Sequence, residues 1–113
     1  MAGKGRADGY PVDTGFDREA LSSTASRIIT PPSNCIEWTI RNASTGGLDL
    51  RLGSTQALAE GTRYFTLQQG ESLTLEGDQT FAVHCPAGAT GAFEIALSAL
   101  GAYDDTTVIG AEV

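Results

Sequence analysis

This chain of 113 residues has few of the side chains on which catalysis and metal binding depend. It contains one histidine, two cysteines and one tryptophan. One histidine and two cysteines without a Cys-x-x-Cys spacing make a poor ligand set for zinc. The sequence also has no phosphate-binding glycine loop, no nucleophile elbow and no spaced acidic loop for calcium. These absences predict a protein that is not an enzyme and holds no metal and no cofactor.

Basic residues and long apolar runs are scarce as well. Lysine and arginine together number 7 against 14 acidic residues, so the net charge is −7. Nucleic acids and anionic membranes are bound through clustered Lys and Arg, so we expect neither as a partner. No run approaches the ~20 apolar residues of a spanning helix, and the first residues lack the apolar core of a secretion signal. We therefore expect folding in a cytoplasm, with Cys35 and Cys85 as free thiols.

His84 is the one histidine available for nucleophilic chemistry. It precedes Cys85 in an alternating segment, so the two side chains point to opposite faces of a strand and do not pair directly. We expect His84 to lie exposed on a polar face, and Cys35 to share a face with Glu37. A Cys35–Cys85 disulfide and a Cys35–His84 pair across strands are the alternatives that sequence leaves open. The glycosylation-like triplet that begins at Asn42 is expected to form a turn.

Three alternating runs between residues 66 and 97 are the most informative feature that is present. Apolar and polar residues alternate there at 73–75, 81–85 and 93–97. A period of two puts successive side chains on opposite faces of a strand. Four further runs, at 27–30, 35–41, 48–52 and 63–67, bring the total to about seven strands. We therefore predict an all-β antiparallel β-sandwich, jelly-roll or immunoglobulin-like, over residues 26–101, with Trp38 in its core.

The segments outside these runs have other roles. Residues 1–25 mix charges and glycines with few apolar side chains, which predicts an extended N-terminal arm. In this interpretation the arm anchors on a neighbouring subunit; a frayed terminus or a short helical turn over 16–21 are the alternatives. Residues 53–61 are long enough to cross between two sheets, and residues 102–113 form a C-terminal tail or edge strand. The candidate partner-binding residues are Tyr10, Val12, Phe16 and Tyr103.

The segment over residues 31–97 resembles small virion proteins of tailed bacteriophages. The resemblance lies in the runs PPSNCIEWTIRNAS and LDLRLGS and in the later strands with their turns. It implies a decoration or cement protein on the capsid exterior, which bridges adjacent subunits of the major capsid protein. It also implies copies of the chain assembled as a homotrimer at a three-fold position, and it carries over no catalytic residue.

Two other functions remain open at this point. The first is another virion role, as a small tail, collar or fibre-attachment component. The second is a carbohydrate-binding module, which would use an exposed aromatic side chain at Tyr64 or Phe65. These two residues are adjacent in a strand, so one of them must face outward.

Overall fold

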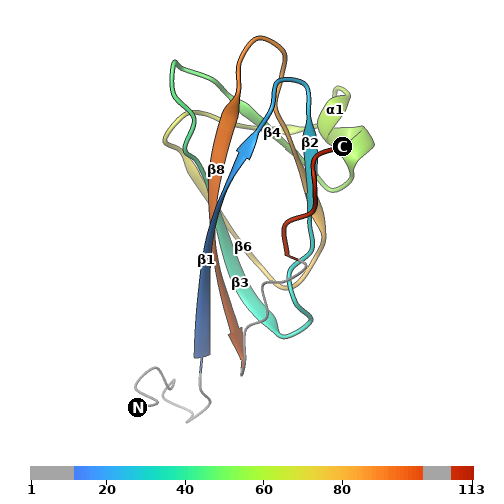
Figure 1. Cartoon of the computed structure of the whole chain (residues 1–113). Coiled ribbons are helices and arrows are strands. Elements are labelled where there is room, and N and C mark those ends of the chain that lie inside the picture. The colour runs from blue at the N-terminus through green and yellow to red at the C-terminus, as the bar shows by residue number, and fades with distance from the viewer. Residues whose placement is uncertain (1–11, 101–107) are drawn as a thin grey trace.

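Two four-stranded antiparallel sheets make up the fold, which the computed structural model describes for residues 12–100 and 108–113 (Figure 1). The elements in chain order are β1 (Val12–Leu21), β2 (Ser26–Ile29), β3 (Cys35–Asn42), β4 (Leu50–Gly53), α1 (Gln56–Glu60), β5 (Phe65–Leu67), β6 (Ser72–Glu76), β7 (Phe81–His84) and β8 (Gly91–Leu100). The strand orders are β1-β8-β3-β6 and β2-β7-β4-β5. Eight strands divided in this way form a jelly roll, which confirms the predicted all-β sandwich.

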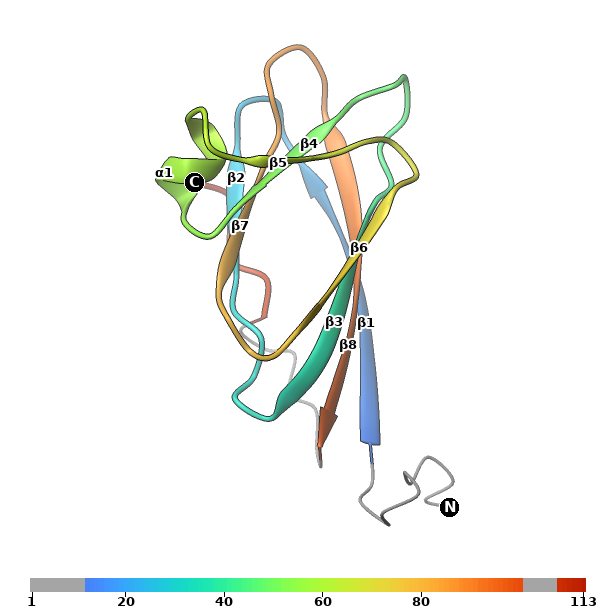
Figure 2. The ribbon, with the colours of Figure 1, turned by 180° about the vertical axis from the view of Figure 1, so that it is seen from behind.

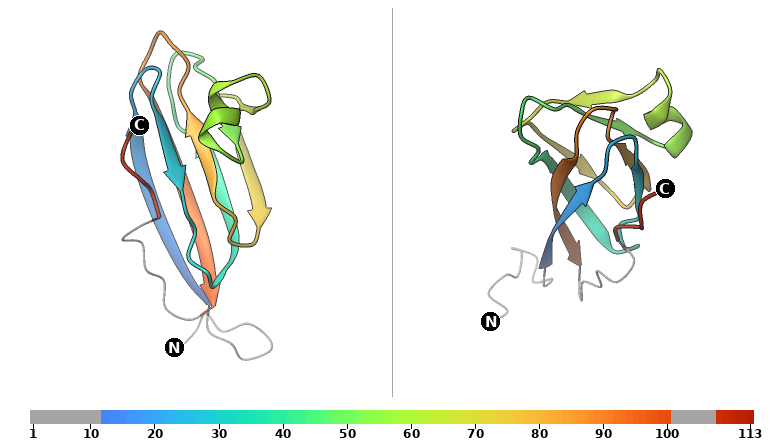
Figure 3. Two further views of the ribbon diagram at one scale, coloured as in Figure 1. Left: turned by 90° about the vertical axis from the view of Figure 1, so that its right-hand side faces the viewer. Right: turned by 45° about the horizontal axis from the view of Figure 1, so that its top comes forward.

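The core lies between the two layers of strands (Figure 3). Buried and half-buried residues alternate along nine of the ten positions of β8. The neighbouring strand β3 of the same sheet points Trp38 and Ile40 into the same space. Trp38 stacks on Phe81 of the other sheet, with ring centroids 3.9 Å apart and planes 3° from parallel. The predicted core position of Trp38 is therefore confirmed, and its ring joins the two sheets.

Residues Val12–Leu21 form the outer strand of the first sheet, which corrects the prediction of an arm over residues 1–25. β1 pairs with β8 along its whole length, from Val12↔Leu100 to Leu21↔Gly91. The charged side chains of this segment led to the prediction of an arm. Edge strands commonly carry such charges, because charged side chains discourage pairing with the strands of other chains. The sandwich therefore includes residues before 26, and a helical turn over 16–21 does not form.

The connection over residues 53–61 holds α1 and does not cross between sheets. β4 and β5 are neighbours in the second sheet, paired from Leu50↔Leu67 to Leu52↔Phe65. The helix begins after Thr55, whose Oγ1 accepts a hydrogen bond from the Leu58 N–H (3.2 Å). The predicted crossing is wrong because the helix takes up the length of the connection. Within the described part of the chain, no helix has the length and apolarity to cross a bilayer.

Residues 108–113 run beside β2 and cover the edge of the second sheet (Figure 1). The Thr30 N–H donates to the Val108 carbonyl (2.8 Å), and Ser26 and Val113 exchange both of their backbone hydrogen bonds. Val108 is buried against the core. Residues 102–113 were predicted to form a C-terminal tail or an edge strand; their described part lies along β2 with one isolated β-bridge, Ile29↔Ile109, and forms no strand of its own. Tyr103 lies outside the described residues.

Candidate functional site

The four sheet edges differ in how they are protected. β2 is covered by residues 108–113, and β1 carries charged side chains at 17–19. β6 instead places Leu73 and Leu75 at its edge, and the Leu75 side chain is 44% exposed. β5 has three residues and begins at the exposed Phe65. β5 and β6 follow one another around a turn and border the same side of the sandwich (Figure 2). The two less protected edges therefore flank one opening.

A cleft of about 250 Å³ opens between the sheets on this side. The Trp38–Phe81 stack forms its inner wall. Apolar side chains from both sheets line it further, namely Leu52, Phe65, Leu73 and Leu75. Its polar lining comes from Ser54, Glu76, Gln79 and Thr80. Ligand sites in proteins are mostly apolar clefts with a few polar groups, so this cleft is the candidate functional site.

Strand register explains why these side chains meet. Trp38 pairs with Leu75 across β3 and β6, so both side chains lie on the inner face of the first sheet. The chain then turns through Gly77, which has a φ of +96° that favours glycine. Phe81 follows as the first residue of β7 and faces Trp38 from the second sheet. The sequence predicted the strands but not this cleft, because the cleft depends on how two edges lie in space.

His84 is buried, and not exposed as the alternation predicted. Its side chain is covered because Ser26 and α1 pack beside it, which leaves 8% exposed. The Ser26 Oγ lies 2.9 Å from His84 Nδ1 and 2.6 Å from Glu60 Oε2. Serine thus stands between the histidine and the carboxylate, whereas a hydrolytic triad places the histidine in the middle. The Ser26 hydroxyl donates to Glu60 and lowers the pKa of that carboxyl, so the cluster fastens α1 to β2 and β7.

Both cysteines are free buried thiols, as predicted. A bulge between Cys35 and Glu37 turns Cys35 inward, which the alternation of the sequence did not predict. Burial raises the pKa of both thiols, so the reactive thiolate form is scarce at neutral pH. Among residues 12–100 and 108–113, no three His, Cys, Asp or Glu side chains gather in a way that would hold a metal ion.

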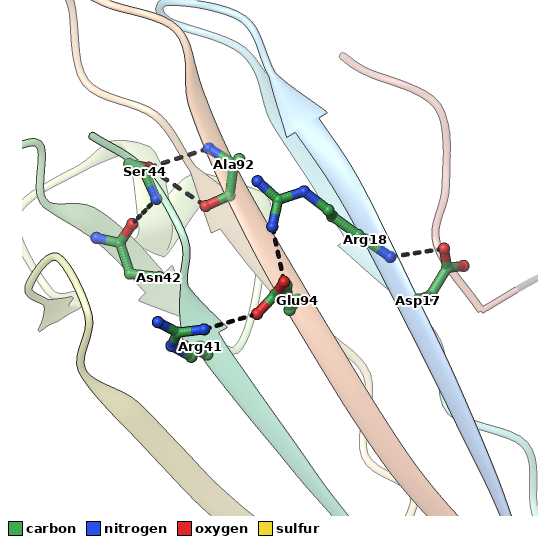
Figure 4. Close-up of polar contacts among 7 residues, drawn as sticks. All are labelled: Asp17, Arg18, Arg41, Asn42, Ser44, Ala92 and Glu94. Carbon is green, nitrogen blue, oxygen red and sulfur yellow. Dashed lines mark hydrogen bonds and ion pairs between the residues drawn. The ribbon is translucent and has the colours of Figure 1, made fainter.

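The outer face of the first sheet carries a second hollow, of about 690 Å³, around an ion-pair network (Figure 4). Arg18 Nη1 donates to Glu94 Oε2 (2.7 Å), and Arg41 Nη1 donates to Glu94 Oε1 (3.0 Å). Both arginine side chains are more than half exposed, so water screens these pairs. Phe16 lies beside the network with 76% of its surface exposed. Its role as an anchor stays a prediction, as does that of Val12, while Tyr10 lies outside the described residues.

Acid should destabilise the fold through carboxylates that accept hydrogen bonds. The Arg18 guanidinium lowers the pKa of Glu94 from its ordinary 4.5, and the Ser22 backbone and hydroxyl lower the pKa of Glu112. Because these pKa values are lower in the folded chain than in the unfolded chain, the stabilisation is present above about pH 4.5 and is lost as the pH falls through the folded values. We expect the urea concentration at the unfolding midpoint to decrease as the pH is lowered from about 5 to about 3.

Glu112→Gln should flatten this pH profile, because it removes one of the carboxylates that drive it. Glu76→Gln is the control, since none of the described residues donates a hydrogen bond to that carboxylate, and it should leave the slope as in the parent chain. Urea unfolding followed by Trp38 fluorescence at each pH measures both. Equal slopes for the Glu112 variant and the parent chain would contradict the assignment.

Comparisons with known proteins inform the fold. No protein-family model matches the sequence, and no curated protein matches it. Solved structures do match its fold at low sequence identity. The Cupin_2 domain of an XRE family transcriptional regulator from Enterobacter cloacae is 14% identical, with a TM-score of 0.53 over 76% of this chain and 94% of that chain. A structure described as Bacillus endospore appendages that form disulfide-linked pili is 17% identical, with a TM-score of 0.52 over 79% and 88%.

A longer protein matches in the same way. The HTH_3 family transcriptional regulator from Vibrio cholerae is 14% identical, with a TM-score of 0.54 over 74% of this chain. The chain spans only 42% of the length of that regulator. At these identities the likeness shows the fold alone, which is the cupin-like double-stranded β-helix.

The predicted virion function is wrong by this comparison. The structures described above are cupin-domain, transcriptional-regulator and endospore-appendage proteins, and none of them is a phage capsid protein. The resemblance to phage proteins rested on strand and turn motifs, which unrelated sandwiches share. Of the two aromatic side chains named for carbohydrate binding, Phe65 is 50% exposed, whereas the Arg51 guanidinium lies 4.5 Å from the centre of the Tyr64 ring and covers one of its faces. That alternative stays an untested prediction. Binding to a major capsid protein, a homotrimer and a place on the capsid exterior stay untested predictions.

Proposed function

We propose that this chain is a non-enzymatic binding module that holds an apolar ligand in the cleft between β5 and β6. The observation that carries the proposal is the position of Leu75 and Phe65, two large apolar side chains left exposed at the mouth of a cleft walled by aromatic rings. Exposed apolar residues that gather around a concavity are typical of binding sites, whereas single ones scattered over a surface are not.

The size of the cleft limits what it accepts. Its volume of about 250 Å³ lies below the range of drug-sized sites, which begins at ~300 Å³. It therefore suits an aromatic ring or a few aliphatic carbons. The flat contact of Trp38 with Phe81 supplies a rigid wall for such a group.

The polar side chains support binding without catalysis. Burial raises the pKa of both thiols and so keeps them protonated, and Ser26 is fully enclosed beneath α1. The excess of acidic residues also makes a nucleic acid a poor ligand for this surface. An uncharged apolar molecule is not repelled by the acidic residues, and its binding requires no reactive side chain.

Fluorescence tests the proposal directly, because Trp38 is the one tryptophan of the chain and lines the cleft. The uncharged probe N-phenyl-1-naphthylamine should bind by inserting one of its aromatic rings into the cleft, and should quench Trp38. Leu75→Lys should weaken this binding at least about tenfold, since it places a charge at the mouth of the cleft. Leu100→Lys is a matched control because Leu100 is also 44% exposed but does not line the cleft, since the even-numbered residues of β8 face away from the core. Equal binding by the two variants would overturn the proposal.

A further inference from the structure

β6 leaves one row of backbone groups facing the opening of the cleft. The Gly77 N–H donates to the Ile36 carbonyl, and the Glu71 carbonyl accepts from the Asn42 N–H. Because backbone groups alternate sides along a strand, the odd-numbered residues from 71 to 77 turn theirs toward β3. β6 is the last strand of its sheet, so the even-numbered residues turn their N–H and C=O groups outward, namely Ser72, Thr74 and Glu76.

The same strand borders the cleft with its inner side chains. Leu73 and Leu75 lie on the face that Trp38 shares. A further strand placed beside β6 would therefore lay alternate side chains next to these leucines and toward Phe81. A small molecule would fill the apolar space but would leave the outward backbone groups to water. An extended peptide satisfies both features at once.

Charge around β6 distinguishes between two kinds of peptide. Glu71, Glu76 and Asp78 bracket the strand and are all exposed. Within the described ranges, none of these three carboxylates forms an ion pair. Pairing β6 with β6 of a second copy would bring the carboxylates of both copies to one junction, which is unfavourable. A segment with lysine or arginine at its ends would instead be attracted.

We propose that the cleft receives an extended segment of a different polypeptide, which adds to β6 as an antiparallel strand. Its alternate apolar side chains enter the cleft beside Leu75 and Phe81, and its basic ends face Glu71 and Glu76. This inference rests on the proposed apolar cleft and names the chemistry of its ligand. Backbone hydrogen bonds fix the register, and the apolar side chains select which face of the segment turns inward.

A synthetic peptide tests the geometry, with three valine-threonine repeats between two terminal lysines. With the valines in the cleft, the threonines lie opposite Ser72 and Thr74 and exchange backbone hydrogen bonds with them. N-methylation of the threonine amides should therefore weaken binding at least about tenfold. N-methylation of the same number of valine amides should leave the affinity within about threefold, because those amides point away from β6. Quenching of Trp38 reports all three affinities.

Charge and competition complete the test. Replacing the two lysines of the peptide with glutamates should weaken its binding to the parent chain, and Glu76→Lys should reduce that preference, since Glu71 and Asp78 remain. Equal affinities of the two methylated peptides would overturn strand addition. If no peptide binds while N-phenyl-1-naphthylamine does, strand addition is overturned and the apolar site stands. If the naphthylamine fails as well, the proposed function itself falls. A protein dimer that the peptide dissociates would show that the occupant is a second copy, which contradicts our choice.

Discussion

Replacing Asn42 with leucine should lower the free energy of unfolding by about 4 kcal/mol. Asn42 is fully buried at the end of β3. Its Nδ2 donates to the Leu48 carbonyl (2.9 Å) and to the Leu67 carbonyl (2.8 Å), and its Oδ1 accepts from the Ser44 N–H (2.9 Å; Figure 4 shows the last contact). One side chain therefore satisfies three backbone groups.

The cost arises from those backbone groups and not from lost volume. Leucine fills a similar space, so no large cavity forms, but it leaves three buried groups without partners at ~1–3 kcal/mol each. Two of these groups are carbonyls of the second sheet or of the segment that leads into it. Leu67 is the last residue of β5, and Leu48 lies two residues before β4. The loss would therefore loosen the contact between the sheets beside the turn from β5 to β6.

Urea unfolding measures this effect, with Thr39→Val as the control in the same strand. The Thr39 hydroxyl bonds to Thr74 on the exposed face (2.8 Å), so its removal should change stability by no more than about 0.5 kcal/mol. Asn42→Asp keeps the acceptor for Ser44 but loses both donors, and should fall below the parent chain as well. A loss below about 1 kcal/mol for the leucine variant would contradict the role given to Asn42.

Seven of the eight strands were predicted from sequence because each has one face in the core. In β8 and β3 the apolar residues recur at every second position, which is the direct result of a buried inner face. β1 was not predicted as a strand because its alternation of apolar and polar residues is interrupted. It lies at an edge of its sheet, Phe16 faces outward, and residues 17–19 are charged. β6 is also an edge strand, but Leu73 and Leu75 alternate with small polar residues there, so its pattern could be recognised while that of β1 could not.

The site was harder to predict than the fold. Three features depended on contacts between distant segments: α1 covers His84, a bulge turns Cys35 inward, and the cleft forms where two edges lie side by side. None of these follows from a local period of two. One local signal was present, since Leu73 and Leu75 alternate with small polar residues between acidic ends and the strand carries no inner charge. That pattern is typical of an edge left open for pairing.

A methyl group at Gly53 should cost about 3 kcal/mol, through overpacking against α1. The Cβ of an alanine there would lie 2.5 Å from the Ala59 nitrogen, 2.9 Å from the Ala59 Cα and 3.0 Å from the Leu58 carbonyl carbon. All three are backbone atoms, so no side chain can rotate away and the helix itself must move. Ala59 is fully buried against the sheet, so α1 cannot shift without losing that contact. Urea unfolding of Gly53→Ala gives the cost.

Gly77→Ala separates steric from conformational effects. Nothing lies within 4 Å of a Cβ at Gly77, but its φ of +96° strains any other residue, so we expect a smaller cost of about 1–2 kcal/mol. If Gly53→Ala costs no more than this, α1 is not held as closely as the structure indicates. Gly53 also lines the cleft, so folded Gly53→Ala protein should bind N-phenyl-1-naphthylamine more weakly than the parent chain if α1 and β4 have to move apart. Stability and binding would then change together, as expected if α1 supports a strand whose residues line the site.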